Sequence, residues 1–418
     1  MREARLALFF FCSALVTFSC SSDPPTAGEA TSTEATTTPA GGDVGATPSG
    51  PQPAAPVDPP GPLSPERAVV AKLGLPPRLL IGLGNDLPTQ GFDYTKCDIY
   101  GLPNKLDLHY VYLSGLKGQG GWPDDNPGGT YVNLHADAAA AKGIVPMFTL
   151  YQAAAWGEED WQALQNRDFM VPYWQGAKLL FERLAAFGKP AVVHFEPDLW
   201  GFAQQHSTGD DPRTVKVKVG SVLPECSGLA EDIAGMGKCL VRLARTIAPK
   251  VVVGFQASTF GAPNAQRVAQ FLTKVGADEA DITVVETLDR DAGCFEARTD
   301  PECQRQDGTY YWDETNTKSP SFKDHLAWAK TIRAGVGKPL LWWQTPLGVP
   351  KGSPGGSSGR YRDNRVKYMF AHPDEFVAAG GIGIAFGVGA PNQTTVRTDG
   401  GQFKNAIAGY FAAPVALP

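Results

Sequence analysis

Short apolar segments recur along the chain from residue 64 onward, and a segment with helical character follows each of them. Most of these apolar segments are almost continuously hydrophobic instead of alternating, which is typical of parallel strands that helices cover. We expect eight strands, at residues 79–86, 106–113, 143–152, 190–196, 250–256, 281–286, 339–344 and 381–387.

The segments between these strands predict helices. The first begins with Ser64 as its cap and Pro65 in its first turn, and the third is long or broken near Pro172. Strands and helices that alternate in this way over about 340 residues predict a (β/α)8 barrel. A doubly wound open sheet is the alternative, but no Gly-x-Gly-x-x-Gly follows the first strand. The helices are expected at residues 64–72, 131–142, 158–188, 229–247, 264–275, 322–334, 361–379 and 403–412.

The first twenty residues have the layout of an export signal. Arg2 and Arg5 precede a mostly apolar run that is too short to span a membrane. The run ends at Cys20, and it resembles a bacterial lipoprotein signal in which Cys20 is lipidated. Thr17 and Phe18 depart from the residues usual in that signal. We expect residues 1–20 to be a lipoprotein-type signal peptide, with ordinary secretion or an uncleaved anchor as alternatives.

Residues 21–64 consist mainly of Thr, Pro, Ala, Gly and Ser, which cannot bury enough apolar surface to fold. We expect this linker to tether the folded domain, residues 65–418, to a membrane through the lipid at Cys20. The protein is then exported to the periplasm or cell surface, or secreted, and acts as a monomer. Its net charge of −6 and its lack of a Lys/Arg-rich run argue against nucleic-acid binding.

Five cysteines follow the signal, and export places them in an oxidising compartment. Proximity in the sequence predicts two disulfides, Cys226–Cys239 and Cys294–Cys303. Cys97 is then left as a buried thiol. No Cys-x-x-Cys or His-Cys spacing suggests zinc.

The fourth strand carries the strongest candidate for chemistry. Its residues Val192, His194 and Glu196 share one parity, so they point to one face of the strand. Pro197 cannot continue a central strand, so the chain leaves the sheet there. A carboxylate at the C-terminal end of a barrel strand is well placed for acid–base catalysis.

Polar and aromatic residues collect at the other predicted strand ends, where a barrel places its active site. Flat aromatic faces stack on sugar rings, while amides and carboxylates bind hydroxyl groups. The sequence therefore predicts a sugar site. The expected substrate-binding residues are Asp86, Trp122, Gln152, Trp156, His194, Asp198, Trp200, Gln256, Trp343 and Gln344.

Hydrolysis of a glycosidic bond usually requires two carboxyl groups. Glu196 is the expected acid, because burial beside Phe195 and Trp200 raises the pKa of a carboxyl group. Glu286 at the end of the sixth strand is the expected partner, together with Asp289 in the following loop. Asp291 and Asp86 are rivals. Residues on the fourth and sixth strands lie about 9 Å apart, which is nearer the inverting range.

A metal cluster of His194, Glu196, Asp198 and His206 is the competing interpretation. The first strand lacks the His-x-His pair that metal-dependent barrel hydrolases carry, so we expect no catalytic metal and no cofactor.

The segment Phe195-Glu196-Pro197 resembles the large clan of barrel glycoside hydrolases that have an acid/base Glu before Pro on strand four. His194 to Pro197 is also similar to a segment of barrel endo-mannosidases. The resemblance implies hydrolysis of a polysaccharide, and it is carried by only a few residues of the motif. Two positions depart from it, because Phe195 replaces the clan's Asn and Gln344 occupies the place of the nucleophilic Glu.

We therefore expect an exported glycoside hydrolase that acts on a polysaccharide or oligosaccharide. A non-catalytic carbohydrate-binding lipoprotein on the same barrel is the first alternative. A barrel hydrolase of different chemistry, such as a metal-dependent esterase, is the second.

Overall fold

The computed structural model describes residues 62–86, 93–157, 159–262, 264–287, 292–298, 303, 311–353, 362–389 and 393–418. Gly61–Pro418 forms one compact unit. The expected signal peptide and most of the linker lie outside the described residues, as do Asp289 and Asp291.

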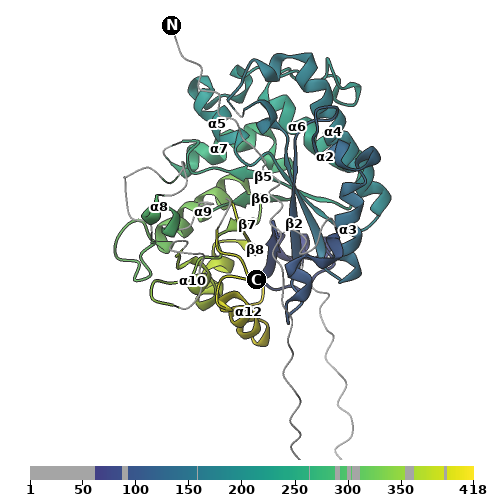
Figure 1. The fold of residues 1–418 in the computed structure, drawn as a ribbon. Helices are drawn as coiled ribbons and strands as arrows, with labels where there is room; N and C mark the ends of the chain where they lie inside the picture. The colour runs from purple at the N-terminus through teal and green to yellow at the C-terminus, as the bar shows by residue number, and fades with distance from the viewer. Residues whose placement is uncertain are drawn as a thin grey trace, which may run out of the picture. The chain divides into compact units, whose positions relative to one another are not determined.

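The described chain contains eight parallel strands that close into a barrel, in which each strand pairs with the next and β8 pairs with β1 (Figure 1). The predicted (β/α)8 fold is confirmed, because every expected strand is present with its ends moved by a few residues. The strands are β1 (Leu80–Gly84), β2 (Leu108–Ser114), β3 (Val145–Tyr151), β4 (Val192–Phe195), β5 (Val252–Ala257), β6 (Ile282–Val285), β7 (Leu340–Thr345) and β8 (Gly381–Gly387).

Helices surround the strands, as a barrel requires (Figure 1). They are α1 (Pro65–Lys72), α2 (Trp122–Asp125), α3 (Tyr131–Ala141), α4 (Arg167–Phe187), α5 (Leu199–His206), α6 (Ile233–Ile247), α7 (Ala265–Val275), α8 (Ala292–Ala297), α9 (Phe322–Val336), α10 (Arg365–Ala371), α11 (Pro373–Ala378) and α12 (Gln402–Ala412).

The helices α2, α5 and α8 were not expected, and two of the expected helices differ at a proline. α4 continues through Pro172 without interruption. The lost hydrogen bond is tolerated there because one face of α4 is fully buried, including Phe169 and Trp174. The helix expected at residues 361–379 instead divides into α10 and α11, since Pro373 begins a new helix.

The hydrophobic core has two layers, one between strands and helices and one inside the barrel. Val193 and Phe195 belong to the outer layer, whereas Val192 belongs to the inner one. α1 closes the N-terminal end of the barrel, because its buried Val70 belongs to the same cluster as the inward-facing strand residues. The barrel interior is therefore sealed at one end, and only its C-terminal mouth is left for a ligand.

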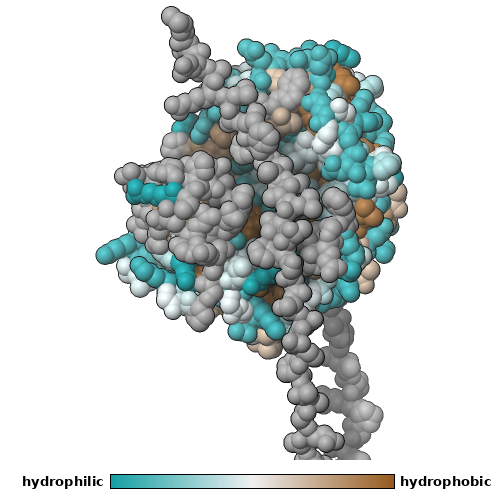
Figure 2. Space-filling view, in the orientation of Figure 1, coloured by the Kyte–Doolittle hydropathy of each residue, from teal (hydrophilic) through white to brown (hydrophobic). Residues whose placement is uncertain are grey.

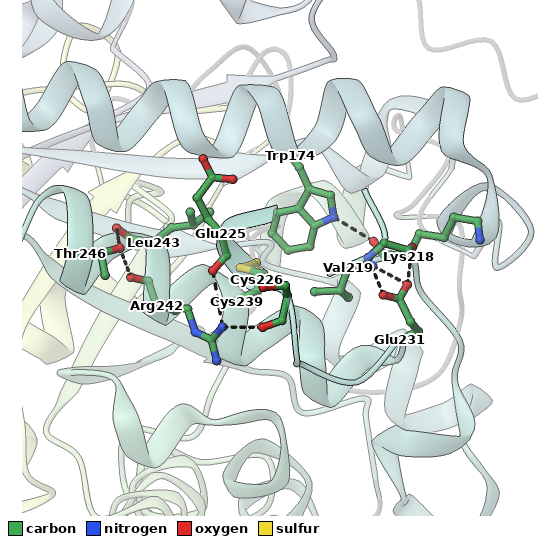
Figure 3. Close-up of a disulfide and its surroundings, with 12 residues drawn as sticks. Trp174, Lys218, Val219, Glu225, Cys226, Glu231, Cys239, Arg242, Leu243 and Thr246 are labelled. Carbon is green, nitrogen blue, oxygen red and sulfur yellow. Dashed lines mark hydrogen bonds between the residues drawn. A yellow bond between two sulfur atoms is a disulfide. The ribbon is translucent and has the colours of Figure 1, made fainter. Parts of the chain in front are cut away.

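Both predicted disulfides are confirmed, and Cys97 is a buried cysteine outside them. Figure 3 shows the first, in which Cys226 ties a loop to Cys239 of α6. Around it, the indole Nε1 of Trp174 donates to the Lys218 carbonyl oxygen at 2.8 Å, and the Val219 N–H donates to Glu231 at 2.8 Å (Figure 3). The bridge thus joins the loop between α5 and α6 to the outer helical layer.

The coloured surface on the face shown in Figure 2 is mainly hydrophilic. Figure 2 shows teal and white residues over most of the coloured surface in that view, with isolated brown patches. The exposed large hydrophobic residues in the described part of the chain are Leu63, Leu134 and Phe260. Within that part, no helix has both the length and the apolar character needed to cross a membrane.

Candidate active site at the barrel mouth

Two carboxylates stand at the C-terminal mouth of the barrel. Asp198 follows β4 and Glu286 follows β6, and both side chains belong to half-buried residues. The hydroxyl of Tyr112, from β2, lies within electrostatic reach of both. Its pKa is raised well above the ordinary value, chiefly by burial and further by Asp198 and Glu286. Both acidic groups, which follow different strands, therefore lie close enough to Tyr112 to raise its pKa.

Hydrogen bonds from neighbouring strands hold the polar groups of this mouth. The Tyr151 hydroxyl at the end of β3 donates to Asp198 Oδ2 at 3.2 Å. The amide Nε2 of Gln344 on β7 donates to the Tyr112 hydroxyl. The rings of Tyr112 and Tyr151 lie 5.9 Å apart. Four strands thus fix a cluster of two tyrosines, one amide and one carboxylate.

The backbone is strained at the same end of the barrel. Asn85 after β1, Glu196 after β4 and Gln344 near the end of β7 all have positive φ values, of 52°, 42° and 51°. The ladder between β7 and β8 also shifts register between Trp342 and Thr345. Such conformations cost about 1–3 kcal/mol each and concentrate at functional sites. The strain marks the mouth as the candidate active site.

Glu196 is placed differently from the sequence expectation. The residue is 0% exposed, and its carboxyl oxygens accept hydrogen bonds from the Gln152 and Ala153 N–H groups at 3.1 and 3.0 Å. Burial is the main cause that raises the pKa of this carboxyl to about 8, in the expected direction. In this structure Glu196 fastens the end of β3 to β4 and has no surface for a substrate. Its catalytic role stays a prediction that requires a movement to expose it.

Three other predicted substrate residues are packed behind the strands. Trp122 is 2% exposed, and its indole Nε1 donates to Gln152 Oε1 at 3.1 Å. Gln152 is itself 0% exposed and donates to the Tyr173 carbonyl oxygen of α4. Trp200 donates to the Phe195 carbonyl oxygen at 2.8 Å and is 1% exposed. These indoles pack in the core and present no face to a sugar in this structure.

The predicted residues His194, Gln256 and Trp343 lie inside the barrel beneath the mouth. The His194 and Trp343 rings are 4.7 Å apart. Burial lowers the pKa of His194 to about 3, so its imidazole is neutral. His194 Nε2, the Gln256 amide and Trp343 Nε1 have no hydrogen-bond partner of good geometry within the described chain. These three residues therefore form a buried layer with polar atoms below the carboxylates of Asp198 and Glu286.

Asp86 is held by hydrogen bonds to residues that are not among the predicted site residues. Its Oδ1 contacts His109 Nε2 at 2.8 Å, and its Oδ2 accepts the Ile99 N–H at 2.8 Å. It also lines a cavity of about 270 Å³ beside the ends of β1 and β8, together with Asp98 and Arg397. Of the remaining predictions, Asp289 lies outside the described residues, and the structure does not describe the side chain of Trp156.

Sequence reasoning missed Tyr112 as a site residue. The signal was present, because Leu108, Tyr110 and Tyr112 share one parity on β2, and Leu108 and Tyr110 both lie in the inner core. Tyr112 is the next residue with this inward orientation, and it lies closer to the C-terminal end of β2, where the barrel opens. Tyr151 is the last residue of β3 and has the parity of Val145 and Met147, which also lie in the inner core.

No family model and no curated protein matches the chain. Solved structures with a similar arrangement include D-allulose 3-epimerase from Methylomonas sp., at 14% identity, with 81% of this chain and 98% of that chain covered and a TM-score of 0.43. Another is the Cellulomonas fimi endo-beta-1,4-mannanase double mutant, at 13% identity, with coverage of 84% and 75% and a TM-score of 0.48. A third is 2,3-dimethylmalate lyase, at 12% identity, with coverage of 78% and 81% and a TM-score of 0.36. Identities and scores this low assign no activity to the present chain.

Proposed function

We propose that the protein is a glycoside hydrolase whose carboxylate pair is Asp198 and Glu286. The observation that carries the proposal is the position of these two half-buried acids around Tyr112 at the one end of the barrel that α1 does not close. Glycosidic hydrolysis needs an acid and a second carboxylate on opposite sides of the scissile bond.

The strand positions favour an inverting arrangement. β4 and β6 are separated by β5 alone. Two inter-strand steps correspond to about 9–10 Å, which leaves room for a water molecule beside the sugar. Tyr151 orients Asp198 through its hydrogen bond, so Asp198 suits the base that activates water. Glu286 is then the acid that protonates the leaving oxygen.

The surroundings of the pair suit a hydroxyl-rich ligand. Tyr112 and Tyr151 are half-buried aromatic residues whose rings lie 5.9 Å apart, and the amide of Gln344 donates to the Tyr112 hydroxyl. His194 and Gln256 below the rim carry buried polar atoms that an ordered water can satisfy. Convergent polar groups on a largely apolar wall are typical of small-molecule sites.

The test measures reducing-end release by the full chain across a panel of soluble polysaccharides. The wild type is expected to cleave at least one of them. Asp198→Asn and Glu286→Gln are each expected to lower kcat by about 10²-fold or more. Asp374→Asn, on exposed α11, is the matched control and should keep wild-type activity. Wild-type rates in both mouth variants would overturn the proposed pair.

Gln344 favours a second candidate, a carbohydrate-binding protein without hydrolase activity. Its amide replaces a carboxylate at the strand-seven position of the hydrolases that this chain resembles, and it is bonded to Tyr112. A wild type that binds a polysaccharide in affinity electrophoresis but releases no reducing ends from it would establish this candidate.

Export and lipid anchoring belong to the same proposal. Two disulfides are consistent with an oxidising compartment. Cells that express the chain should incorporate labelled palmitate into it, and Cys20→Ala should abolish the labelling. Equal labelling of that variant would contradict an anchor at Cys20.

A further inference from the structure

Three residues of the kinds that bind metals lie near the end of β1 and on β2, separate from the proposed carboxylate pair. The ligand atoms of Asp86, Cys97 and His109 all lie within 4.8 Å of one another. Cys97 and His109 are buried at 4% and 3% exposure, and Asp86 is half-buried. A thiol, an imidazole and a carboxylate so close together form a ligand set that matches zinc.

Neighbouring groups hold two of these ligands in position. The Tyr100 hydroxyl contacts His109 Nδ1 at 2.8 Å, which leaves Nε2 facing Asp86. The Ile99 N–H donates to Asp86 Oδ2. In protein metal sites, the ring nitrogen that does not bind the metal usually has such a partner, which fixes the orientation of the ring.

His135 on α3 is an independent sign of a ligand at this place. The residue is 3% exposed, and neither of its ring nitrogens has a hydrogen-bond partner in the described chain. Its ring packs against Tyr94 and Tyr131, and the centre of its ring is 6.3 Å from that of His109. Buried imidazoles are ordinarily paired, so His135 is a polar group that a bound ion would satisfy.

We propose that Asp86, Cys97 and His109 bind a zinc ion, and that His135, which lies outside this group of three, becomes the fourth ligand when its ring moves toward the ion. A site with four protein ligands is of the structural kind, in which the ion links segments of the chain. Here it would join the end of β1, the segment around Cys97, β2 and α3. The inference is independent of the proposed hydrolase activity.

One of the proposed ligands also borders a cavity beside β1. Asp86 lines the cavity, which has a volume of about 270 Å³, and so does Asp98. The carboxylate of Asp98 is paired with Arg397 at 2.8 Å. Because Arg397 also lines the cavity and neutralises Asp98, Asp86 is the proposed zinc ligand through which the cavity borders the site.

The test loads the purified full chain with ZnCl₂ alone, removes excess metal by dialysis and measures the bound zinc. The wild type should retain about one equivalent, and its melting temperature should rise with zinc. Cobalt in place of zinc should give a thiolate-to-metal charge-transfer band. Cys97→Ser should lose the band and bind zinc at least about tenfold more weakly.

His206→Gln is the matched control, because His206 is exposed on α5 and should leave the zinc content unchanged. Alkylation of the wild type, at a urea concentration that exposes the buried Cys97, gives a readout that needs no variant, since bound zinc should slow the reaction of this thiol with iodoacetamide. A wild type with no zinc after dialysis and no metal protection of Cys97 would show a hydrogen-bonded cluster only, and would overturn the proposal.

Discussion

At Glu196, one backbone angle turns the side chain away from the barrel interior, where the strand pattern had predicted it. Strand parity aims Val192, His194 and Glu196 at one face, and the first two do face the barrel interior. The φ value of 42° at Glu196 ends the alternation, and its carboxyl turns to the N–H groups that follow β3. A left-handed conformation at a non-glycine residue has no reliable sequence signal, so this reversal could not be predicted.

The raised pKa of Glu196 predicts a pH-dependent stability. Burial raises the pKa from the ordinary 4.5 to about 8, so between these values the folded state holds a proton that the unfolded state has lost. The protonated Glu196 contributes fully to the free energy of unfolding below pH 4.5, and this contribution is lost as the pH rises through 8. In urea unfolding across this range, the wild type should lose more than about 1 kcal/mol relative to Glu196→Gln.

The comparison with Glu196→Gln cancels the titration of all other groups, because both proteins share them. Parallel pH profiles for the two proteins would show that Glu196 has the same pKa in the folded and unfolded states. That result would contradict the burial described for its carboxyl.

At the scale of elements, the eight strands were predictable because parallel strands in a barrel are buried on both faces and read as continuous apolar runs. The ends of helices were less predictable. α5 was missed because it follows Glu196 almost directly, without the usual loop, and only eight residues form it. Pro172 and Pro373 show why proline is an ambiguous signal, since it lies inside one helix and begins another.

Glycines at the ends of β1 and β8 make room for the ring of Tyr110. A Cβ atom at Gly387 would lie 2.0 Å from the Tyr110 hydroxyl, and one at Gly84 would lie 2.2 Å from its ring. Gly387→Ala should therefore destabilise the fold by about 1–3 kcal/mol through overpacking, measured by chemical denaturation.

Gly409→Ala is the matched control for that substitution. Gly409 lies in α12, and a Cβ there meets no atom within 4 Å. Alanine should leave the stability unchanged or raise it slightly, because glycine weakens a helix. Equal effects of the two substitutions would contradict the close packing of Tyr110 at the mouth.

At the scale of the whole molecule, the sequence predicted the barrel and its two disulfides, and the site at the C-terminal ends of the strands stays a prediction. The identity of the residues at that end was only partly predictable. Asp198 and Glu286 were recognised as strand-end acids, whereas Trp122 and Trp200 were expected at the surface and lie in the core. A tryptophan after a strand has the same sequence signature whether it turns inward or outward, and packing of later elements decides between them.

Closure of the barrel determines where chemistry can occur. α1 covers the N-terminal end, and Arg67 fixes it to the C-terminus through two hydrogen bonds to the Leu417 carbonyl oxygen, at 3.0 and 2.7 Å. The strained positions Asn85, Glu196 and Gln344 all lie at the opposite end. These strained positions and the opening thus coincide at the end where we propose the active site.

The hydrolysis rates of Glu286→Gln and Glu196→Gln, measured side by side on a polysaccharide that the wild type cleaves, test the central claim most directly. The two substitutions are chemically identical, and they differ in whether the carboxylate stands at the mouth or is buried behind it. We expect Glu286→Gln to lose about 10²-fold or more in kcat and Glu196→Gln to keep most of its activity wherever it stays folded. The reverse order, with Glu196→Gln folded but inactive and Glu286→Gln active, would contradict the account.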